Sequence, residues 1–224
     1  MIKGAIFDMD GTLLDSMPVW EHASERYLEQ KGIKVRERLS EVLFTMSMQQ
    51  GAAYVKEKYK LTEDIDTLVS AVNDIVFEAY EKKVMPKPGA PEFLECLEKA
   101  GVPMAVATST DRRMAEAALR RTGLMHYFKA VFTCTEVGRG KREPDIYHAA
   151  AERLGTAPAE TWVFEDALYA LRTAKAAGYR TVGVYDLLSA GDRKEMEETA
   201  DIYREDLCKA AELLERIQSG RQKV

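Results

Sequence analysis

Short apolar runs alternate with segments of helical spacing over residues 86–224, and this alternation strongly constrains the fold. The apolar runs cover residues 103–107, 130–133, 161–164 and 181–185. The clearest helical pattern lies between Pro144, which is typical of a helix entry, and Gly155, which is typical of a helix end. Strands that alternate with helices pair in parallel, so we predict an α/β fold with a doubly wound, Rossmann-like parallel sheet.

A further apolar run at residues 4–7 predicts a buried strand close to the N-terminus. The segment that follows it is Asp8-Met9-Asp10-Gly11-Thr12. Acidic residues beside a glycine favour a tight loop, although an ordinary solvated turn has the same composition. The predicted sheet therefore has five strands, and the first of them ends in carboxylates.

Residues 16–85 have helical periodicity and contain no strong strand pattern. Apolar residues recur on one face from Trp20 to Leu28 and again from Ile65 to Ala79. Pro86 then interrupts the chain. We predict a core domain of residues 1–15 and 86–224, with a small all-helical domain of residues 16–85 inserted after the first strand.

Composition limits the partners and the compartment. The net charge of −5 and the pI near 5.4 argue against a nucleic-acid partner. No apolar stretch approaches 18 residues, and Asp8 comes too early for a signal peptide, so neither membrane insertion nor export is expected. The three cysteines are widely spaced, which fits a reducing cytoplasm and predicts no zinc cluster. No pattern indicates an oligomeric state.

Polar residues follow the carboxyl ends of the predicted strands, where parallel sheets bind their ligands. They are Asp8, Asp10, Thr108, Ser109, Thr110, Glu165 and Asp166, together with Lys141 at the expected start of a helix. Each pair of carboxylates only a few ångströms apart costs about 4 kcal/mol at an effective dielectric near 20, so a cation must accompany them. Lysine supplies one positive charge, and an all-oxygen ligand set favours Mg²⁺ over zinc or copper.

A metal, an ammonium, a hydroxyl and loop N–H groups together suit a dianionic phosphoryl group. A carboxylate oxygen can then attack phosphorus to form an aspartyl phosphate, and a second carboxylate can move protons. We therefore expect the substrate to be a small phosphorylated metabolite.

These segments resemble, in order and spacing, the four motifs of the haloacid dehalogenase superfamily, in the branch of β-phosphoglucomutase and phosphoglycolate phosphatase. The resemblance implies that Asp8 is the nucleophile and that Asp10 is the general acid/base and a metal ligand through its carbonyl. The catalytic residues would be Asp8, Asp10, Thr108 and Lys141. Phosphate would be bound by Met9, Asp10, Thr108, Ser109 and Lys141, and Mg²⁺ by Asp8, Asp10, Glu165 and Asp166. The inserted helical domain would be the family's cap, which closes over the site.

Several alternatives stay open. Glu165 could instead hold a bound water or cap the following helix. Arg142 replaces the family's usual proline after the lysine. A phosphatase is the leading hypothesis, with a sugar phosphomutase as the alternative and a non-catalytic phosphate-binding protein as a third. The mutase branch has a cap histidine and arginine where our alignment places Trp20 and Met48, and this favours the phosphatase.

Overall fold

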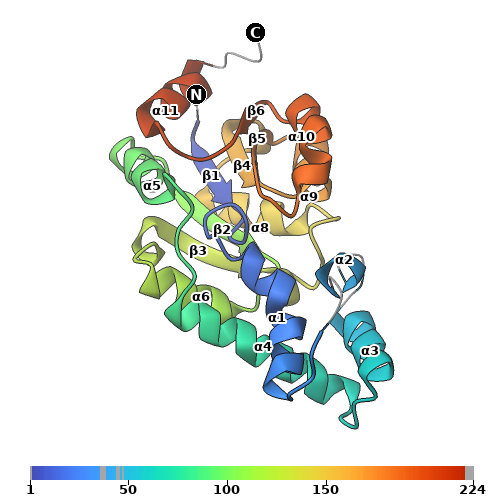
Figure 1. Cartoon of the computed structure of the whole chain (residues 1–224). Coiled ribbons are helices and arrows are strands. Elements are labelled where there is room, and N and C mark those ends of the chain that lie inside the picture. The colour runs from blue at the N-terminus through green and yellow to red at the C-terminus, as the bar shows by residue number, and fades with distance from the viewer. Residues whose placement is uncertain (1, 36–38, 44–45, 47, 220–224) are drawn as a thin grey trace. The chain divides into compact units, whose positions relative to one another are not determined.

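The computed structural model of the chain describes residues 2–35, 39–43, 46 and 48–219 (Figure 1). It contains two compact units, which are Met1–Asp15 with Met85–Val224, and Ser16–Val84. The segments that lead into and out of the insertion, at residues 14–15 and 85–86, run side by side within the first unit. Leu14 forms an antiparallel bridge with Pro86, and the Asp15 N–H donates to the Met85 carbonyl at 2.9 Å.

The first unit is built on a parallel sheet with the strand order β3-β2-β1-β4-β5-β6 (Figure 1). Its strands are β1 (Gly4–Phe7), β2 (Met104–Thr108), β3 (Phe128–Thr133), β4 (Thr161–Glu165), β5 (Arg180–Val184) and β6 (Ile202–Arg204). The strand order reverses direction at β1, so the predicted doubly wound sheet is confirmed. β6 was not predicted, because three residues at the edge of a sheet are too short to show a periodic pattern.

The central strand β1 is fully buried, and it pairs with β2 on one side and β4 on the other. Strands covered on both faces need apolar residues throughout, which accounts for the sequence Gly-Ala-Ile-Phe. Phe7 stacks on Phe164 of β4 with ring centroids 4.3 Å apart and also packs edge-on against Phe93. This packing fixes the carboxyl end of β1, where Asp8 follows.

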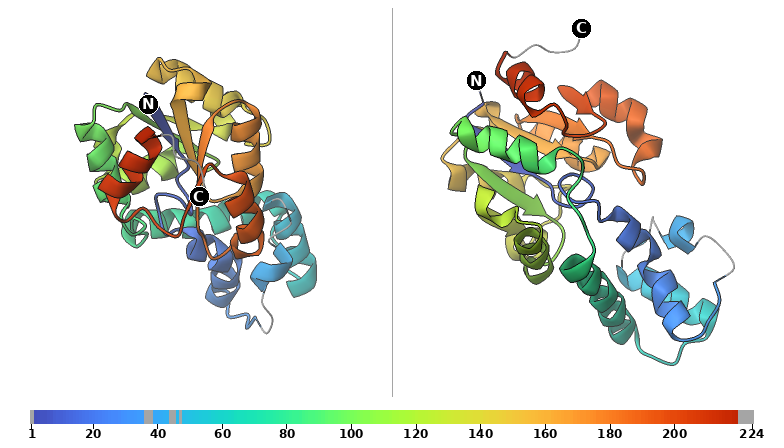
Figure 2. Two further views of the ribbon diagram at one scale, coloured as in Figure 1. Left: turned by 90° about the horizontal axis from the view of Figure 1, so that it is seen from above. Right: turned by 60° about the vertical axis from the view of Figure 1, so that its left-hand side comes forward.

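Helices cover both faces of the sheet (Figure 2). One group consists of α5 (Ala90–Lys99), α6 (Arg112–Arg121) and α11 (Ala210–Ser219). The other consists of α8 (Asp145–Leu154), α9 (Leu168–Ala176) and α10 (Arg193–Thr199). Short elements complete the unit, namely α7 (Cys134–Val137) and the 3-10 turns η1 (Met125–Tyr127), η2 (Pro158–Glu160) and η3 (Ala190–Asp192). α8 lies against β1, β2 and β3, and α9 against β4 and β5.

Lys141 does not open a helix as the sequence suggested. It lies in a turn between α7 and α8, and α8 begins only at Asp145, after Pro144. Proline disfavours helical conformation in the residue before it, so the helix cannot extend back to the lysine. The turn leaves Lys141 free to enter the site from the loop.

Helices are the regular elements of the second unit, and its described residues form no strand, as predicted. Its helices are α1 (Met17–Gln30), α2 (Leu39–Leu43), α3 (Met48–Tyr59) and α4 (Ile65–Lys82). Their apolar faces form a separate core around Tyr27, Leu28, Leu39, Val55 and Leu68. Across the described part of the chain, no helix has the length and apolarity required to cross a membrane.

Candidate active site

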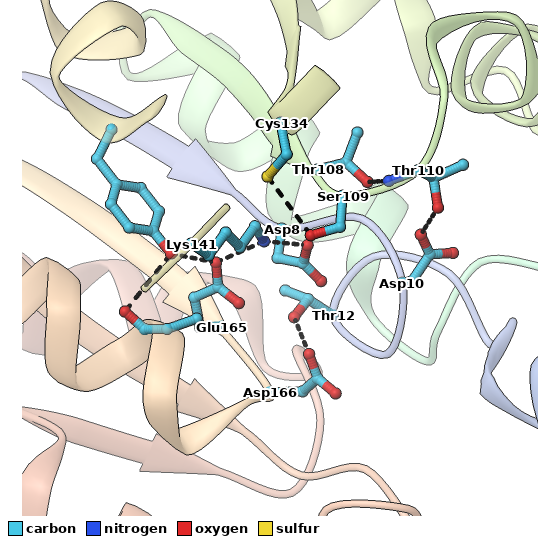
Figure 3. A network of polar contacts seen from close by, with 12 residues as sticks. Asp8, Asp10, Thr12, Thr108, Ser109, Thr110, Cys134, Lys141, Glu165 and Asp166 are labelled. Carbon is cyan, nitrogen blue, oxygen red and sulfur yellow. Dashed lines mark hydrogen bonds and ion pairs between the residues drawn. The ribbon is translucent and has the colours of Figure 1, made fainter. Parts of the chain in front are cut away.

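Asp8 lies at the end of β1 and is the centre of a buried ionic network (Figure 3). Its N–H extends the sheet ladder by donating to the Phe164 carbonyl at 2.9 Å, which fixes its backbone. The Lys141 ammonium donates to Asp8 Oδ1 and, at 2.7 Å, to Glu165 Oε1. Asp8, Lys141 and Glu165 are 6%, 4% and 1% exposed, so these charges interact in a medium largely free of water.

Asp166 brings a third carboxylate to this centre. Ligand oxygens of Asp8, Glu165 and Asp166 all lie within 4.8 Å of one another. Two hydroxyls donate to the Asp166 carboxylate. Thr12 Oγ1 lies 3.4 Å from Asp166 Oδ1, and Ser189 Oγ lies 3.4 Å from Asp166 Oδ2. Asp166 therefore has a fixed orientation at the edge of the acidic cluster.

Burial makes the charged forms of these carboxylates unfavourable. It raises the pKa of Asp8 well above its usual value, although Lys141 opposes the shift. Burial also raises the pKa of Glu165, and burial together with the charges of Glu165 and Asp186 raises the pKa of Asp166 to about 7. Burial disfavours the Lys141 ammonium, yet the attraction of Asp8 and Glu165 raises its pKa above the ordinary value.

This cluster fits a divalent cation. Lys141 can neutralise only one of the three carboxylates that converge here, so ionising all three leaves two negative charges uncompensated. A bound dication would reverse the cost of ionisation, because its own charge dominates the local field. The donors of the cluster are oxygens, which suits a hard cation.

The loop after Asp8 turns sharply and carries Asp10. The N–H groups of Leu13 and Leu14 both donate to the Met9 carbonyl, at 2.9 and 2.8 Å. Gly11 has φ +81°, a conformation that disfavours side chains, and an added Cβ would lie 2.7 Å from Asp166 Cγ. The turn thus brings the backbone against the acidic cluster, at a point where only glycine fits.

The Asp10 carboxylate is held apart from the three clustered carboxylates. Its Oδ2 accepts a hydrogen bond from Thr110 Oγ1 at 2.7 Å, and Thr110 lies in the segment after β2 (Figure 3). Thr108 ends β2 fully buried, and its Oγ1 accepts from the Thr110 N–H at 3.0 Å. Ser109 is exposed, with its Oγ 3.5 Å from Cys134 Sγ. Thr108 therefore anchors the turn that directs Thr110 toward Asp10.

Comparison with known proteins identifies the family. The model of the family described as haloacid dehalogenase-like hydrolase matches residues 5–184. The chain belongs to this family. The expectation of an enzyme of the haloacid dehalogenase type is thereby confirmed.

Two curated relatives are named as phosphatases. The phosphorylated carbohydrates phosphatase of Thermotoga maritima is 31% identical, with 85% of this chain and 88% of the relative covered. Hexitol phosphatase A of Escherichia coli is 34% identical, with 81% of this chain and 82% of the relative covered. A solved Thermotoga maritima structure, provisionally assigned as a β-phosphoglucomutase, is 28% identical with a TM-score of 0.85, covering 96% of this chain and all of that one.

In this haloacid dehalogenase-like chain, the structure brings Asp8, Lys141, Glu165 and Asp166 into contact range, whereas Asp10 is directed to a hydroxyl. Sequence reasoning assigned no site role to four polar residues that contact these groups, namely Thr12, Thr110, Tyr147 and Ser189. Thr12 and Thr110 belong to segments that were already singled out as strand ends. Tyr147 and Ser189 showed no local pattern, because their partners lie 18 and 23 residues away in the chain.

Proposed function

We propose that this chain is a magnesium-dependent phosphatase that hydrolyses a small phosphorylated carbohydrate through an aspartyl phosphate on Asp8. The observation that carries the proposal is the buried contact of Asp8 with the Lys141 ammonium, beside the carboxylates of Glu165 and Asp166. A carboxylate at the end of a central strand, with the Lys141 ammonium beside it and carboxylates that would hold Mg²⁺ close by, is poised to meet a dianionic phosphoryl group.

Mg²⁺ would be held by Asp8, Glu165 and Asp166, with the Asp10 carbonyl as a further ligand, and when bound it would neutralise charge on the phosphoryl oxygens. Lys141 would hold the phosphoryl group electrostatically, together with Thr108, Ser109 and the backbone after Asp8. These groups fit the phosphate because it offers only acceptor oxygens, and lysine, hydroxyls and amides are donors.

The chemistry would take two displacements at phosphorus. An Asp8 oxygen forms a bond to phosphorus while the bond to the sugar oxygen breaks, and Asp10 gives its proton to that leaving oxygen. Asp10 then takes a proton from water, whose oxygen displaces the Asp8 carboxylate and releases inorganic phosphate. The contact with Thr110 supports this role, because it orients the Asp10 carboxylate before either transfer.

The carbohydrate part of the proposal is supported by the relatives, whose names specify phosphorylated carbohydrates and hexitols. We propose further that residues 16–85 act as the family's cap and select the leaving group. Trp20 on α1 is already engaged within that unit, since its Nε1–H donates to the Tyr80 hydroxyl at 2.9 Å.

Asp8→Asn is the direct test. We expect phosphate release from a panel of sugar and sugar-alcohol phosphates to fall by roughly a thousandfold or more, because an amide is a poor nucleophile. The exposed Asp192→Asn variant is the charge-matched control and should retain activity. Metal removal with EDTA should abolish turnover, and added Mg²⁺ should restore it. Unchanged turnover in the Asp8→Asn variant or in metal-free protein would contradict the proposal.

A phosphomutase is the second candidate, favoured by the similarity to the structure provisionally assigned as β-phosphoglucomutase. The same core chemistry would serve both reactions if a second sugar hydroxyl replaced water. A coupled assay that separates isomerised sugar phosphate from free phosphate distinguishes them, and dominant isomer formation would overturn the phosphatase.

A phosphate-binding protein without activity is distinguished by beryllium fluoride, which mimics a phosphoryl group on aspartate. With Mg²⁺ present, beryllium fluoride should raise the melting temperature of the wild type by linkage, but not that of Asp8→Asn. A wild type that shows no such shift and no turnover would favour the binding protein.

A further inference from the structure

Tyr147 lies behind the acidic cluster, on the first turn of α8. Its side chain is fully buried, and its hydroxyl donates to Glu165 Oε1 at 2.8 Å. The same oxygen accepts from Lys141 Nζ at 2.7 Å (Figure 3). Two donors from different parts of the chain therefore hold one oxygen of Glu165.

This contact links α8 to the reacting carboxylate through a continuous series of polar groups. The series runs from Tyr147 to Glu165, from there to Lys141, and from Lys141 to Asp8. The Tyr147 hydroxyl donates and the Glu165 oxygen accepts, so the tyrosine holds the carboxylate without adding a charge to the cluster.

A buried tyrosine hydroxyl needs a hydrogen-bond partner whatever its function. Tyr179 illustrates the purely structural case. It is 2% exposed and packs in the same cluster as Tyr147, with ring centroids 6.1 Å apart. Its hydroxyl, however, pairs with His148 Nδ1 at 2.9 Å and contacts no carboxylate of the site. The two tyrosines thus share a setting and differ in what their hydroxyls touch.

We propose that Tyr147 is a positioning residue that fixes the Glu165 carboxylate, so that Lys141 spans Glu165 and Asp8 and the acidic cluster keeps the geometry that binds a divalent cation. The inference rests on the proposed function, because it assigns Tyr147 a part in the same metal-dependent site. Groups that orient a metal ligand by hydrogen bonding typically change metal affinity or activity by about 10- to 100-fold when removed.

The test compares Tyr147→Phe with Tyr179→Phe in the full chain. Each substitution removes one buried hydroxyl and leaves the ring, so packing is matched. We expect Tyr147→Phe to weaken Mg²⁺ binding to EDTA-stripped protein about 10- to 100-fold by calorimetry. It should also lower kcat at saturating Mg²⁺ while KM for the sugar phosphate changes less than about twofold. Tyr179→Phe should leave Mg²⁺ affinity and kcat unchanged.

A double-mutant cycle checks that Tyr147 acts through Glu165. In a Glu165→Gln background, Tyr147→Phe should cause little further loss of Mg²⁺ affinity, because the two changes share one interaction. Independent, additive losses would overturn the inference.

Other outcomes would overturn the role of Tyr147 or the proposed function. Wild-type affinity and kcat in Tyr147→Phe would overturn the inference, as would a variant that only melts earlier or does not fold, because the hydroxyl would then be purely structural. If the wild type binds Mg²⁺ and turns over, such results affect the role of Tyr147 alone. A wild type that neither binds Mg²⁺ nor releases phosphate would overturn the proposed function and the inference together.

Discussion

Gly11→Ala tests the contact between the loop after β1 and the acidic cluster. Gly11 has φ +81°, and this left-handed conformation costs a residue with a Cβ about 1–2 kcal/mol. The new Cβ would also lie 2.7 Å from Asp166 Cγ, whereas ordinary carbon contacts need about 3.5–4.0 Å. Asp166 must therefore shift by about 1 Å, far more than the roughly 0.2 Å tolerance of metal–ligand distances.

Gly123→Ala is the matched control for this prediction. Gly123 has φ +74° and nothing within 4 Å of an added Cβ. Alanine at this position therefore has the same free-energy cost of the left-handed backbone as alanine at position 11, but it meets no neighbouring side chain. In urea unfolding of metal-free protein, both variants should lose about 1–2 kcal/mol from the backbone alone. In calorimetric titrations, the Mg²⁺ affinity of Gly11→Ala should fall at least about tenfold below that of the wild type. Gly123→Ala should keep the wild-type affinity. Equal Mg²⁺ affinities in the two variants would refute the reasoning.

Two further predictions concern contacts that lie outside the clustered carboxylates. Thr110→Val should lower kcat about tenfold or more, because it removes a hydrogen bond that orients the Asp10 carboxylate. Thr110→Ser should retain activity, and equal kcat values in both variants would contradict a positioning role. Lys87→Met should cost roughly 3–5 kcal/mol in urea unfolding, because it leaves the buried Asp186 without its partner at 2.9 Å. The second substitution, Asp186→Asn, should recover much of that loss in the double variant. If Lys87→Met alone lowers the free energy of unfolding by less than about 1 kcal/mol, the ion pair does not stabilise the fold as argued.

Much of the core could be predicted because its signals are local. A buried parallel strand must be apolar along its whole length, which made β1, β2 and β4 visible in the sequence. The edge strand β6 was missed because it spans only three residues. Lys141 was predicted in the right segment but in the wrong element, since Pro144 delays the start of α8.

In the candidate site, too, some features could be predicted from the sequence and others could not. Parallel strands bring their carboxyl ends to one edge, so the order of the segments was enough to predict that Asp8, Glu165 and Asp166 would converge. Sequence order could not show that the Asp10 carboxylate would turn to Thr110, 100 residues along the chain. That outcome depends on the geometry of two loops, which no local pattern encodes.

The sequence by itself therefore determined the class of fold and the chemical types that meet at the sheet edge, because both follow from apolar periodicity and from residues that adjoin strands. Only the tertiary structure decided which donor holds which oxygen. Tyr147 on Glu165 and Lys87 on Asp186 are examples, and they join residues that are 18 and 99 positions apart in the chain, respectively. Such hydrogen bonds depend on side-chain directions to within fractions of an ångström, and those directions are fixed only when the helices and the sheet pack together.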